Sequence, residues 1–406
     1  MSLVILVFVL VYVGMVLGKL PGLALDRTGV ALLGAIAMVS GGALPISDAW
    51  AAVDMPTIYL LFALMVISAQ FRLAGFYSEL VRRVVRWQTQ PPTLLALVLA
   101  VSGGLSAVLT NDVVCLAVTP VLVEGCVRRS LNPIPFLLGL ACASNVGSAA
   151  TLIGNPQNIL IGQTLGLSFG RFLLDAGAPA VLGLGAIWGV IAWQYRGKWT
   201  KVGIPPDIHA PPFNRWQSFK AVGVSFVLIA LFLFRGSLPR DGVALTCAGV
   251  LLLSRRMASR EMLALVDWQL LVLFVGLFIV NRAFVGTGSM ESVLVTMRGV
   301  GVDPSDPHWL FVLSVTLSNL VSNVPATMLL LPAATHPWAG PILALSSTLA
   351  GNLFIVGSIA NMIVVAGAKS FGVEVDFRTH VRTGLPVTLV TLLIAALWLV
   401  LRVRAG

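Results

Sequence analysis

Charged side chains are scarce in this chain of 406 residues. Asp, Glu, Lys and Arg together make up 10% of the sequence and hydrophobic residues 58%, whereas soluble domains carry about 25% charged residues. Apolar runs of about 20 residues, the length needed to cross a bilayer, recur from end to end. The scarcity of charge excludes a soluble protein and predicts an all-α polytopic membrane protein embedded in a lipid bilayer.

The residues from which catalytic and metal sites are built are also few. There are four histidines, and the four cysteines lie in apolar segments without metal-ligand spacing, so we predict that the cysteines are small buried hydrophobes. No Ser-His-Asp set or His-Glu motif is present, which argues against a membrane-embedded enzyme, and we expect no metal or cofactor. The net charge of +10 arises in short loops beside apolar spans. Such loops orient a protein in the membrane, so nucleic acid is not an expected partner.

Several short blocks occur twice in the chain, in the same order. Residues 29–32 return at 242–245, residues 110–112 are matched by 322–324, and residues 154–158 are matched by 357–361. Duplicated halves with polar, helix-breaking interruptions at matching positions are typical of secondary transporters, and the interruptions indicate the substrate site. We therefore predict a first repeat at 1–200, a cytoplasmic linker at 201–218 and a second repeat at 219–406.

The apolar pattern predicts about ten transmembrane helices. The predicted spans are 3–18, 28–44, 56–73, 134–166, 170–195, 219–236, 241–257, 267–285, 340–370 and 382–402. Two of them, 134–166 and 340–370, are interrupted near the middle and are predicted to be broken helices. Residues 93–127 and 307–335 each hold two apolar arms of roughly 10–16 residues around a polar tip, too short for two crossings. Re-entrant hairpins with tips buried in protein fit these segments better.

The distribution of Lys and Arg predicts the orientation of the chain. With both hairpins treated as non-crossing, most basic residues collect on one side, which should be cytoplasmic. Both termini then face outward, and the two halves have opposite orientations in the inner membrane, as inverted repeats do. Residues 78–87 are predicted to form an amphipathic helix on the cytoplasmic surface.

Four polar interruptions at membrane depth are the candidate substrate site. At the first break, Asn155-Pro156 removes a backbone donor and unwinds the helix, which leaves free carbonyls on one half-helix and free amides on the other. The predicted substrate-binding residues are Asn111, Ser144, Asn145, Asn155, Gln157, Asn158, Ser322, Asn323, Ser358 and Asn361. The predicted break and hairpin positions are Gly154, Pro156, Pro325 and Gly357. Small polar residues also join helices in membranes, and this alternative stays open for Ser148 and Ser346.

Asp112 is the one carboxylate that we place deep in the core. An ionisable group there is costly, so a functional role is expected ahead of a structural pairing. Desolvation favours its protonated form, which would let it exchange protons near neutral pH. Asp54 and Asp267 stand just before spans at matching positions and are predicted helix N-caps. No Arg or Lys falls at the four interruptions, so an anionic substrate would depend on helix-end amides alone.

These motifs resemble the ion transporter superfamily of ArsB/NhaD permeases and divalent anion:sodium symporters. The resemblance covers essentially the whole chain. Its most specific parts are residues 109–112, 144–147, 154–161 and 322–325. In the symporter branch both tips carry Ser-Asn-Thr, whose oxygens help to bind sodium, whereas here Thr-Asn-Asp and Ser-Asn-Val lack the final hydroxyl. The Asn111-Asp112 pair is most similar to the ArsB-type arsenite efflux permeases.

The resemblance implies a secondary active transporter, and we predict efflux of arsenite or antimonite in exchange for protons carried by Asp112. Trivalent arsenic is mainly an uncharged trihydroxide at neutral pH, and Asn, Ser and Thr side chains with helix-end amides suit its hydroxyls. A sodium-coupled anion or dicarboxylate symporter and a sodium/proton antiporter stay open. A channel would not need a duplicated site. The resemblance also suggests a homodimer, and a soluble ATPase partner stays open.

Overall fold

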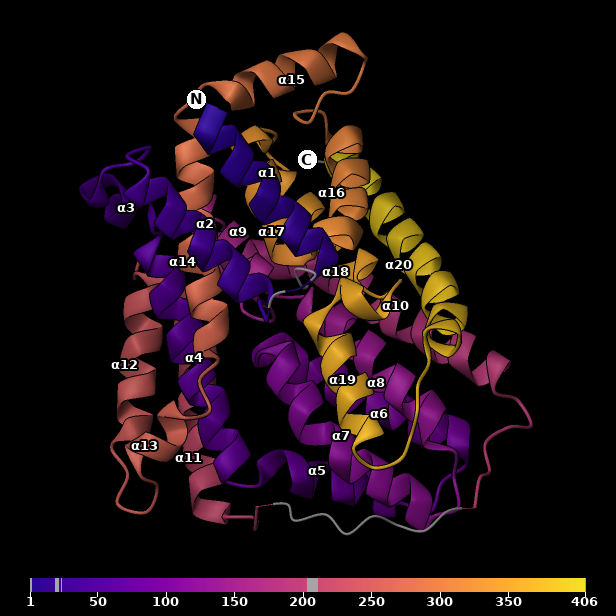
Figure 1. Cartoon of the computed structure of the whole chain (residues 1–406). Coiled ribbons are helices and arrows are strands. Elements are labelled where there is room, and N and C mark those ends of the chain that lie inside the picture. Colours follow the sequence, from indigo (N-terminus) through magenta and orange to yellow (C-terminus); the bar gives the residue numbers. More distant parts are fainter. Residues whose placement is uncertain (1, 19–21, 23, 203–210, 406) are drawn as a thin grey trace.

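The chain folds as a bundle of helices. The computed structural model describes residues 2–18, 22, 24–202 and 211–405, and every regular element within these residues is a helix (Figure 1). In the described part of the chain, six helices are long and apolar enough to cross a membrane: α4 (Met55–Leu73), α6 (Pro91–Val108), α10 (Phe169–Gln194), α11 (Arg215–Phe234), α14 (Trp268–Val285) and α20 (Phe377–Ala405). The predicted all-α polytopic class is confirmed, whereas the number of crossings stays a prediction.

Two helices are shorter than the spans predicted for them. The predicted span 28–44 is α2 (Arg27–Ser40), which ends at the paired glycines Gly41-Gly42. The predicted span 241–257 is α12 (Arg240–Leu252). Beyond α12, the Ser254 hydroxyl accepts hydrogen bonds from the backbone amides of Arg256 and Met257. Such a local turn competes with the backbone hydrogen bonds that would continue the helix. The first helix, α1 (Ser2–Leu17), is close to its predicted bounds.

Within the described residues, four short helices connect the predicted spans and hairpins: α3 (Ile46–Ala52), α5 (Phe76–Arg86), α13 (Ser259–Leu263) and α15 (Ser289–Gly299). The helix predicted at 78–87 is present as α5. Gly75 before α5 and Gly288 before α15 take the same left-handed conformation, with φ of 66° and 70°. Figure 1 places α5 and α15 at opposite ends of the molecule, which is the arrangement expected if the halves are inverted.

Each predicted hairpin consists of two helices that meet at a polar tip. The first comprises α6 and α7 (Asn111–Arg128). The second comprises α16 (Pro307–Val321), α17 (Asn323–Leu330) and the 3₁₀ helix η1 (Leu331–Ala333). The arms α6 and α7 have 18 residues each, longer than the roughly 10–16 predicted from apolar arm lengths. Ser102 bonds back to the Val98 carbonyl and Pro120 lies inside α7, so neither residue ends its helix.

Each predicted broken helix consists of two helices separated by irregular backbone. The first break separates α8 (Pro133–Ser148) from α9 (Pro156–Thr164). The second separates α18 (Ala339–Ala350) from α19 (Ile359–Lys369), with the 3₁₀ helix η2 (Ile355–Gly357) between them. Residues 203–210 of the predicted linker lie outside the described residues, and α11 begins within the range predicted as linker.

The two halves exchange helices in their packing. Helix α2 of the first half packs against α14 of the second, and α12 of the second packs against α4 of the first. The long helices α10 and α20 pack against each other, and α7 packs against α19. The hairpin tips and helix breaks of both halves therefore meet in the interior of the molecule.

Candidate functional site

The break between α8 and α9 is shaped by Asn155, Pro156 and Gly154. The Asn155 side chain caps α9 by accepting a hydrogen bond from the Asn158 amide at 2.9 Å, and Pro156 occupies the first turn. A Cβ on Gly154 would lie 2.3 Å from the Ser148 carbonyl oxygen. Only glycine lets the chain pass this close to the end of α8.

One asparagine spans each break with the same pair of hydrogen bonds. The Asn158 side-chain nitrogen donates to the carbonyls of Ser148, at 3.3 Å, and Thr151, at 2.8 Å. Asn361 donates to the carbonyls of Gly351, at 2.8 Å, and Phe354, at 3.0 Å. Both side chains are fully buried. The carbonyls freed where the helices end are thus satisfied from within the break.

The tip of the first hairpin is bonded to the first break and to α8. The Asn111 backbone amide donates to the Gly154 carbonyl at 3.1 Å, and the Asn111 side-chain nitrogen donates to Asn145 Oδ1 at 3.3 Å. The Ser144 hydroxyl donates to the Asn111 carbonyl at 3.1 Å. Asn111 is therefore held through both its backbone and its side chain.

Asn145 connects the two halves of the chain. Its side-chain nitrogen donates to Asn352 Oδ1 at 2.9 Å and to Asn361 Oδ1 at 3.1 Å. Its side-chain oxygen accepts hydrogen bonds from Ser358 Oγ at 2.9 Å and from Asn111. A buried amide with donors and acceptors on both sides joins the first tip to the second break.

The tip of the second hairpin is bonded to the first break in turn. With its side-chain nitrogen facing neighbouring carbonyls, Asn323 donates to Ser347 at 3.1 Å and to Gly357 at 3.3 Å, and it accepts from Gln157 Nε2 at 3.2 Å. Gln157 and Asn155 both donate to Thr348 Oγ1, at 3.0 and 3.3 Å. The second tip therefore contacts the break of the first half directly, through Asn323 and Gln157. The first tip is linked to the break of the second half through the side chain of Asn145.

A chamber of about 530 Å³ reaches the second tip. Its lining includes Ser322 and Pro325 of the tip, Asp267 at the start of α14, and Asp26 and Arg27 at the start of α2. The Arg27 side chain is half-buried and donates to the Met15 carbonyl at 3.2 Å. The sequence placed no cation at the four interruptions, and the fold brings Arg27, at the start of α2, to this chamber.

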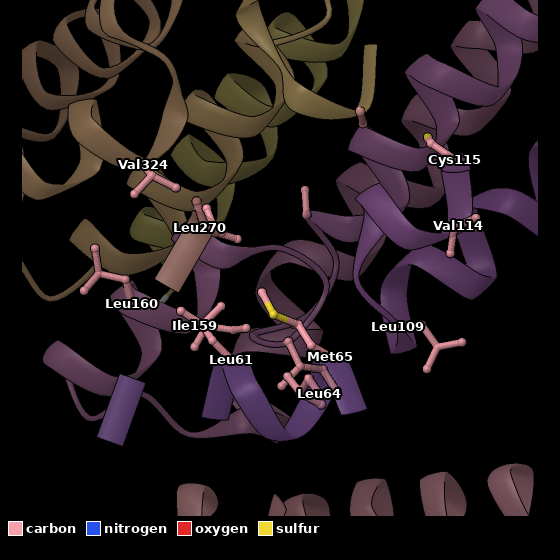
Figure 2. Close-up of a cluster of buried hydrophobic side chains, with 14 of the residues drawn as sticks. Leu61, Leu64, Met65, Leu109, Val114, Cys115, Ile159, Leu160, Leu270 and Val324 are labelled. Atoms are coloured by element: carbon pink, nitrogen blue, oxygen red, sulfur yellow. The ribbon is translucent and has the colours of Figure 1, made fainter. Parts of the chain in front are cut away.

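Apolar side chains surround the polar cluster. Figure 2 shows Leu61, Leu64 and Met65 of α4 near Ile159 and Leu160 of α9, with residues from both hairpins and from α14 in the same group. These side chains are buried, and they surround the polar cluster with apolar groups. Hydrogen bonds in such surroundings are stronger, and unpaired polar groups cost more.

Nine of the ten predicted substrate-binding residues lie in one hydrogen-bonded cluster: Asn111, Ser144, Asn145, Asn155, Gln157, Asn158, Asn323, Ser358 and Asn361. The tenth, Ser322, lines the chamber. Asp112 stands next to the cluster, half-buried at the start of α7. Among the described residues, Asp112 forms no ion pair, and no group of three or more His, Cys, Asp or Glu is placed to hold a metal.

The cluster also contains Ser148, Ser318, Ser347, Thr348 and Asn352, which were not among the predicted site residues. Thr348 was identifiable, because it holds the place in the second half that Asn145 holds in the first. Two smaller predictions are confirmed. Asp54 and Asp267 accept hydrogen bonds from Thr57 and Leu270 as N-caps, and all four cysteines are buried.

Comparison with known proteins identifies transporters. Residues 8–341 match the CitMHS family, described as citrate transporter. The silicon efflux transporter LSI3 of Oryza sativa subsp. japonica is 30% identical, with 92% of each chain covered. The putative transporter arsB of Dictyostelium discoideum is 23% identical, over 92% of this chain and 87% of its own. The crystal structure of the Alcanivorax borkumensis YdaH transporter aligns with a TM-score of 0.58 at 15% identity, over 98% of this chain and 96% of that chain.

Proposed function

Because this chain belongs to the CitMHS citrate transporter family, a family of membrane transporters and not of enzymes, we propose that it exports a small uncharged hydroxide, arsenite or antimonite, across the inner membrane in exchange for protons. Membership confirms the resemblance to the ion transporter superfamily. The solute, the coupling ion and the direction are the parts that we propose.

The absence of charge from the buried cluster is the observation that carries the proposed substrate class. Its side chains are amides and hydroxyls contributed by both halves, and Arg and Lys are absent from it among the described residues. Within the same residues, the buried side-chain oxygens of Asn111 and Asn158 accept no hydrogen bond. An uncharged solute with several hydroxyls can donate to such oxygens and accept from amide nitrogens. It would not leave a buried charge unpaired.

Asp112 supports proton coupling in the proposed cycle. Its carboxyl group stands in the first turn of α7, directly after Asn111, and has no cationic partner among the described residues. The amino-terminal end of α7 favours a carboxylate at this position, whereas the apolar side chains nearby favour the neutral acid. A group under both influences suits a step in which a proton is bound and then released.

We further propose that residues 1–200 and 219–406 are inverted repeats, with both termini outside. The matching bonds of Asn158 and Asn361, the exchanged packing of α2 and α12, and the opposite positions of α5 and α15 support this relation. Single cysteines in a cysteine-free background test it. Gln88→Cys, after α5, should react with a membrane-impermeant thiol reagent only from the cytoplasm, and Val300→Cys, after α15, only from outside. Reaction of both from one side would contradict the inverted arrangement.

A carboxylate symporter is the second candidate. The description of the family favours a carboxylate, and Arg27 supplies a cation in the chamber at the second tip. Silicic acid, suggested by the name of the rice relative, is another uncharged hydroxide and falls within the first proposal.

Flux into and out of proteoliposomes distinguishes the two candidates. Arsenite, antimonite, silicic acid, citrate and succinate are each tested with a pH gradient and, separately, with a sodium gradient. We expect a pH gradient to drive uphill movement of an uncharged hydroxide. Sodium-driven uptake of citrate or succinate without any hydroxide transport would overturn the proposal in favour of the symporter.

A further inference from the structure

The crevice between α5 and α7 is a second charged site, separate from the cluster at the tips. It encloses about 710 Å³ and is lined by Arg82, Val85, Arg86, Gln88, Val121, Glu124, Gly125, Arg128 and Arg129. Four arginines therefore face one glutamate. The transport cluster is uncharged, so these arginines have no part in the function proposed above.

The walls of the crevice are held together firmly. Arg129 donates to the carbonyls of Val85, Trp87 and Thr89 at 2.8–3.0 Å, which ties the end of α7 to the end of α5. A Cβ on Gly125 would lie 2.5 Å from a Val85 methyl group, so α5 and α7 are in close contact at this position. The crevice is thus a preformed feature of the fold.

The positive charge in the crevice is only partly neutralised. Glu124 pairs with Arg128 at 2.9 Å and lies 3.9 Å from Arg82. Arg86 forms no ion pair within the described part of the chain. One carboxylate shared by two arginines, with a third arginine beside them, leaves donors and charge for an anion. Arginine is well suited to phosphate because its donors match two phosphate oxygens.

The surroundings of the crevice are typical of a membrane surface. Helix α5 buries Val81 and Val85 on one side and carries arginines on the other, and Trp87 directly after it is 62% exposed. Basic amphipathic helices lie in the headgroup region, where Trp is also enriched. Basic pockets between membrane helices bind anionic headgroups.

We propose that the crevice binds the phosphate headgroup of an anionic phospholipid, held by Arg82, Arg86 and Arg128. The lipid would bridge α5 and α7. The crevice lies at the end of α7 that is remote from the tip at Asn111. The bound headgroup would therefore hold the second arm of the first hairpin at the membrane surface.

Lipid binding to the purified full-length protein tests the proposal. Phosphatidylglycerol is titrated in detergent and its binding is followed by native mass spectrometry and by the thermal unfolding midpoint. Phosphatidylcholine serves as the uncharged lipid, and inorganic phosphate as the soluble source. One basic residue near an anionic surface contributes about 1 kcal/mol, or about fivefold in affinity, so the triple variant Arg82→Gln, Arg86→Gln, Arg128→Gln should bind phosphatidylglycerol about a hundredfold more weakly.

The control variant removes the same charge elsewhere. Arg255→Gln, Arg256→Gln, Arg260→Gln lies in the exposed segment around α13 and should bind phosphatidylglycerol as the wild type does. Arg86→Glu alters one unpaired residue, so it should fold and still bind several-fold more weakly. Equal binding of the two lipids, equal losses in both triple variants, or full occupancy by inorganic phosphate alone would each overturn the headgroup assignment.

Discussion

The two hairpin tips stand at matching places in the sequence but differ in backbone and surroundings. At the first tip, Thr110 has φ −60° and ψ 129°, an ordinary extended conformation. At the second tip, Ser322 has φ 76° and ψ 163°, a region that residues other than glycine rarely adopt. Ser322 also lines the 530 Å³ chamber, whereas Thr110 and Asn111 are buried. The first tip is relaxed and enclosed, and the second is strained and accessible.

The chemistry of the tips differs as well. The first tip continues into Asp112 and a helix of 18 residues, and the second continues into Val324 and a helix of 8 residues. Asparagine is common to both, and each asparagine bonds to the inner cluster. Backbone strain is confined to the second tip. We propose that the shared asparagines contact the solute and that proton exchange belongs to the first tip alone.

Removal of either shared asparagine should have the largest effect. Asn111→Ala and Asn323→Ala each remove buried side-chain hydrogen bonds of the cluster, at a cost of about 0.5–1.5 kcal/mol for each bond. We expect transport to fall to the level of protein-free liposomes in both variants while the proteins still fold. Thr316→Ala, on an exposed part of α16, is the control. Normal transport by both tip variants would mean that Asn111 and Asn323 only join helices and do not contact the solute.

Asp112→Asn should separate coupling from transport. The amide keeps the size of the side chain but cannot exchange a proton. Uphill export driven by a pH gradient should stop, while downhill exchange of substrate continues. Asp48→Asn, an exposed carboxylate in the first turn of α3, should leave both activities unchanged. Uphill transport by Asp112→Asn would require another proton carrier.

Alanine at the matched glycines of the breaks should affect stability to different degrees. In Gly154→Ala the new Cβ meets backbone at 2.3 Å, whereas in Gly357→Ala the nearest atom is 3.1 Å away. We expect Gly154→Ala to cost about 1–3 kcal/mol and Gly357→Ala clearly less. Thermal unfolding in detergent measures both. A larger loss for Gly357→Ala would contradict the tighter packing of the first break.

Glycine at the tips should give the smallest and most diagnostic effect. Ser322→Gly removes the cost of the positive φ and should raise stability by about 1 kcal/mol. Thr110→Gly removes no strain and should lower stability by about 0.5–1 kcal/mol. Thermal unfolding midpoints that shift in opposite directions would support the difference between the tips, and shifts in the same direction would contradict it.

The sequence predicted those features that depend on local chemistry. Asn155-Pro156 ends one helix and caps the next through its own side chain, so the break could be located from its residues. The length of α6 could not be predicted from its residues, because Ser102 and the glycines beside it stay helical within tertiary packing. The position of Arg27 in the chamber could not be predicted either, because its approach to the second tip depends on how α2 packs against α14. The strain at Ser322 has no counterpart in the sequence pattern.

Equilibrium binding to the purified protein tests the central claim most directly. Isothermal titration calorimetry at neutral pH, where arsenite is uncharged, compares arsenite and antimonite with citrate, in the wild type and in Asn323→Ala. We expect that a hydroxide binds, that citrate does not, and that Asn323→Ala abolishes the binding heat. Sodium-dependent binding of citrate, with no heat from any hydroxide, would contradict an uncharged substrate at the tips.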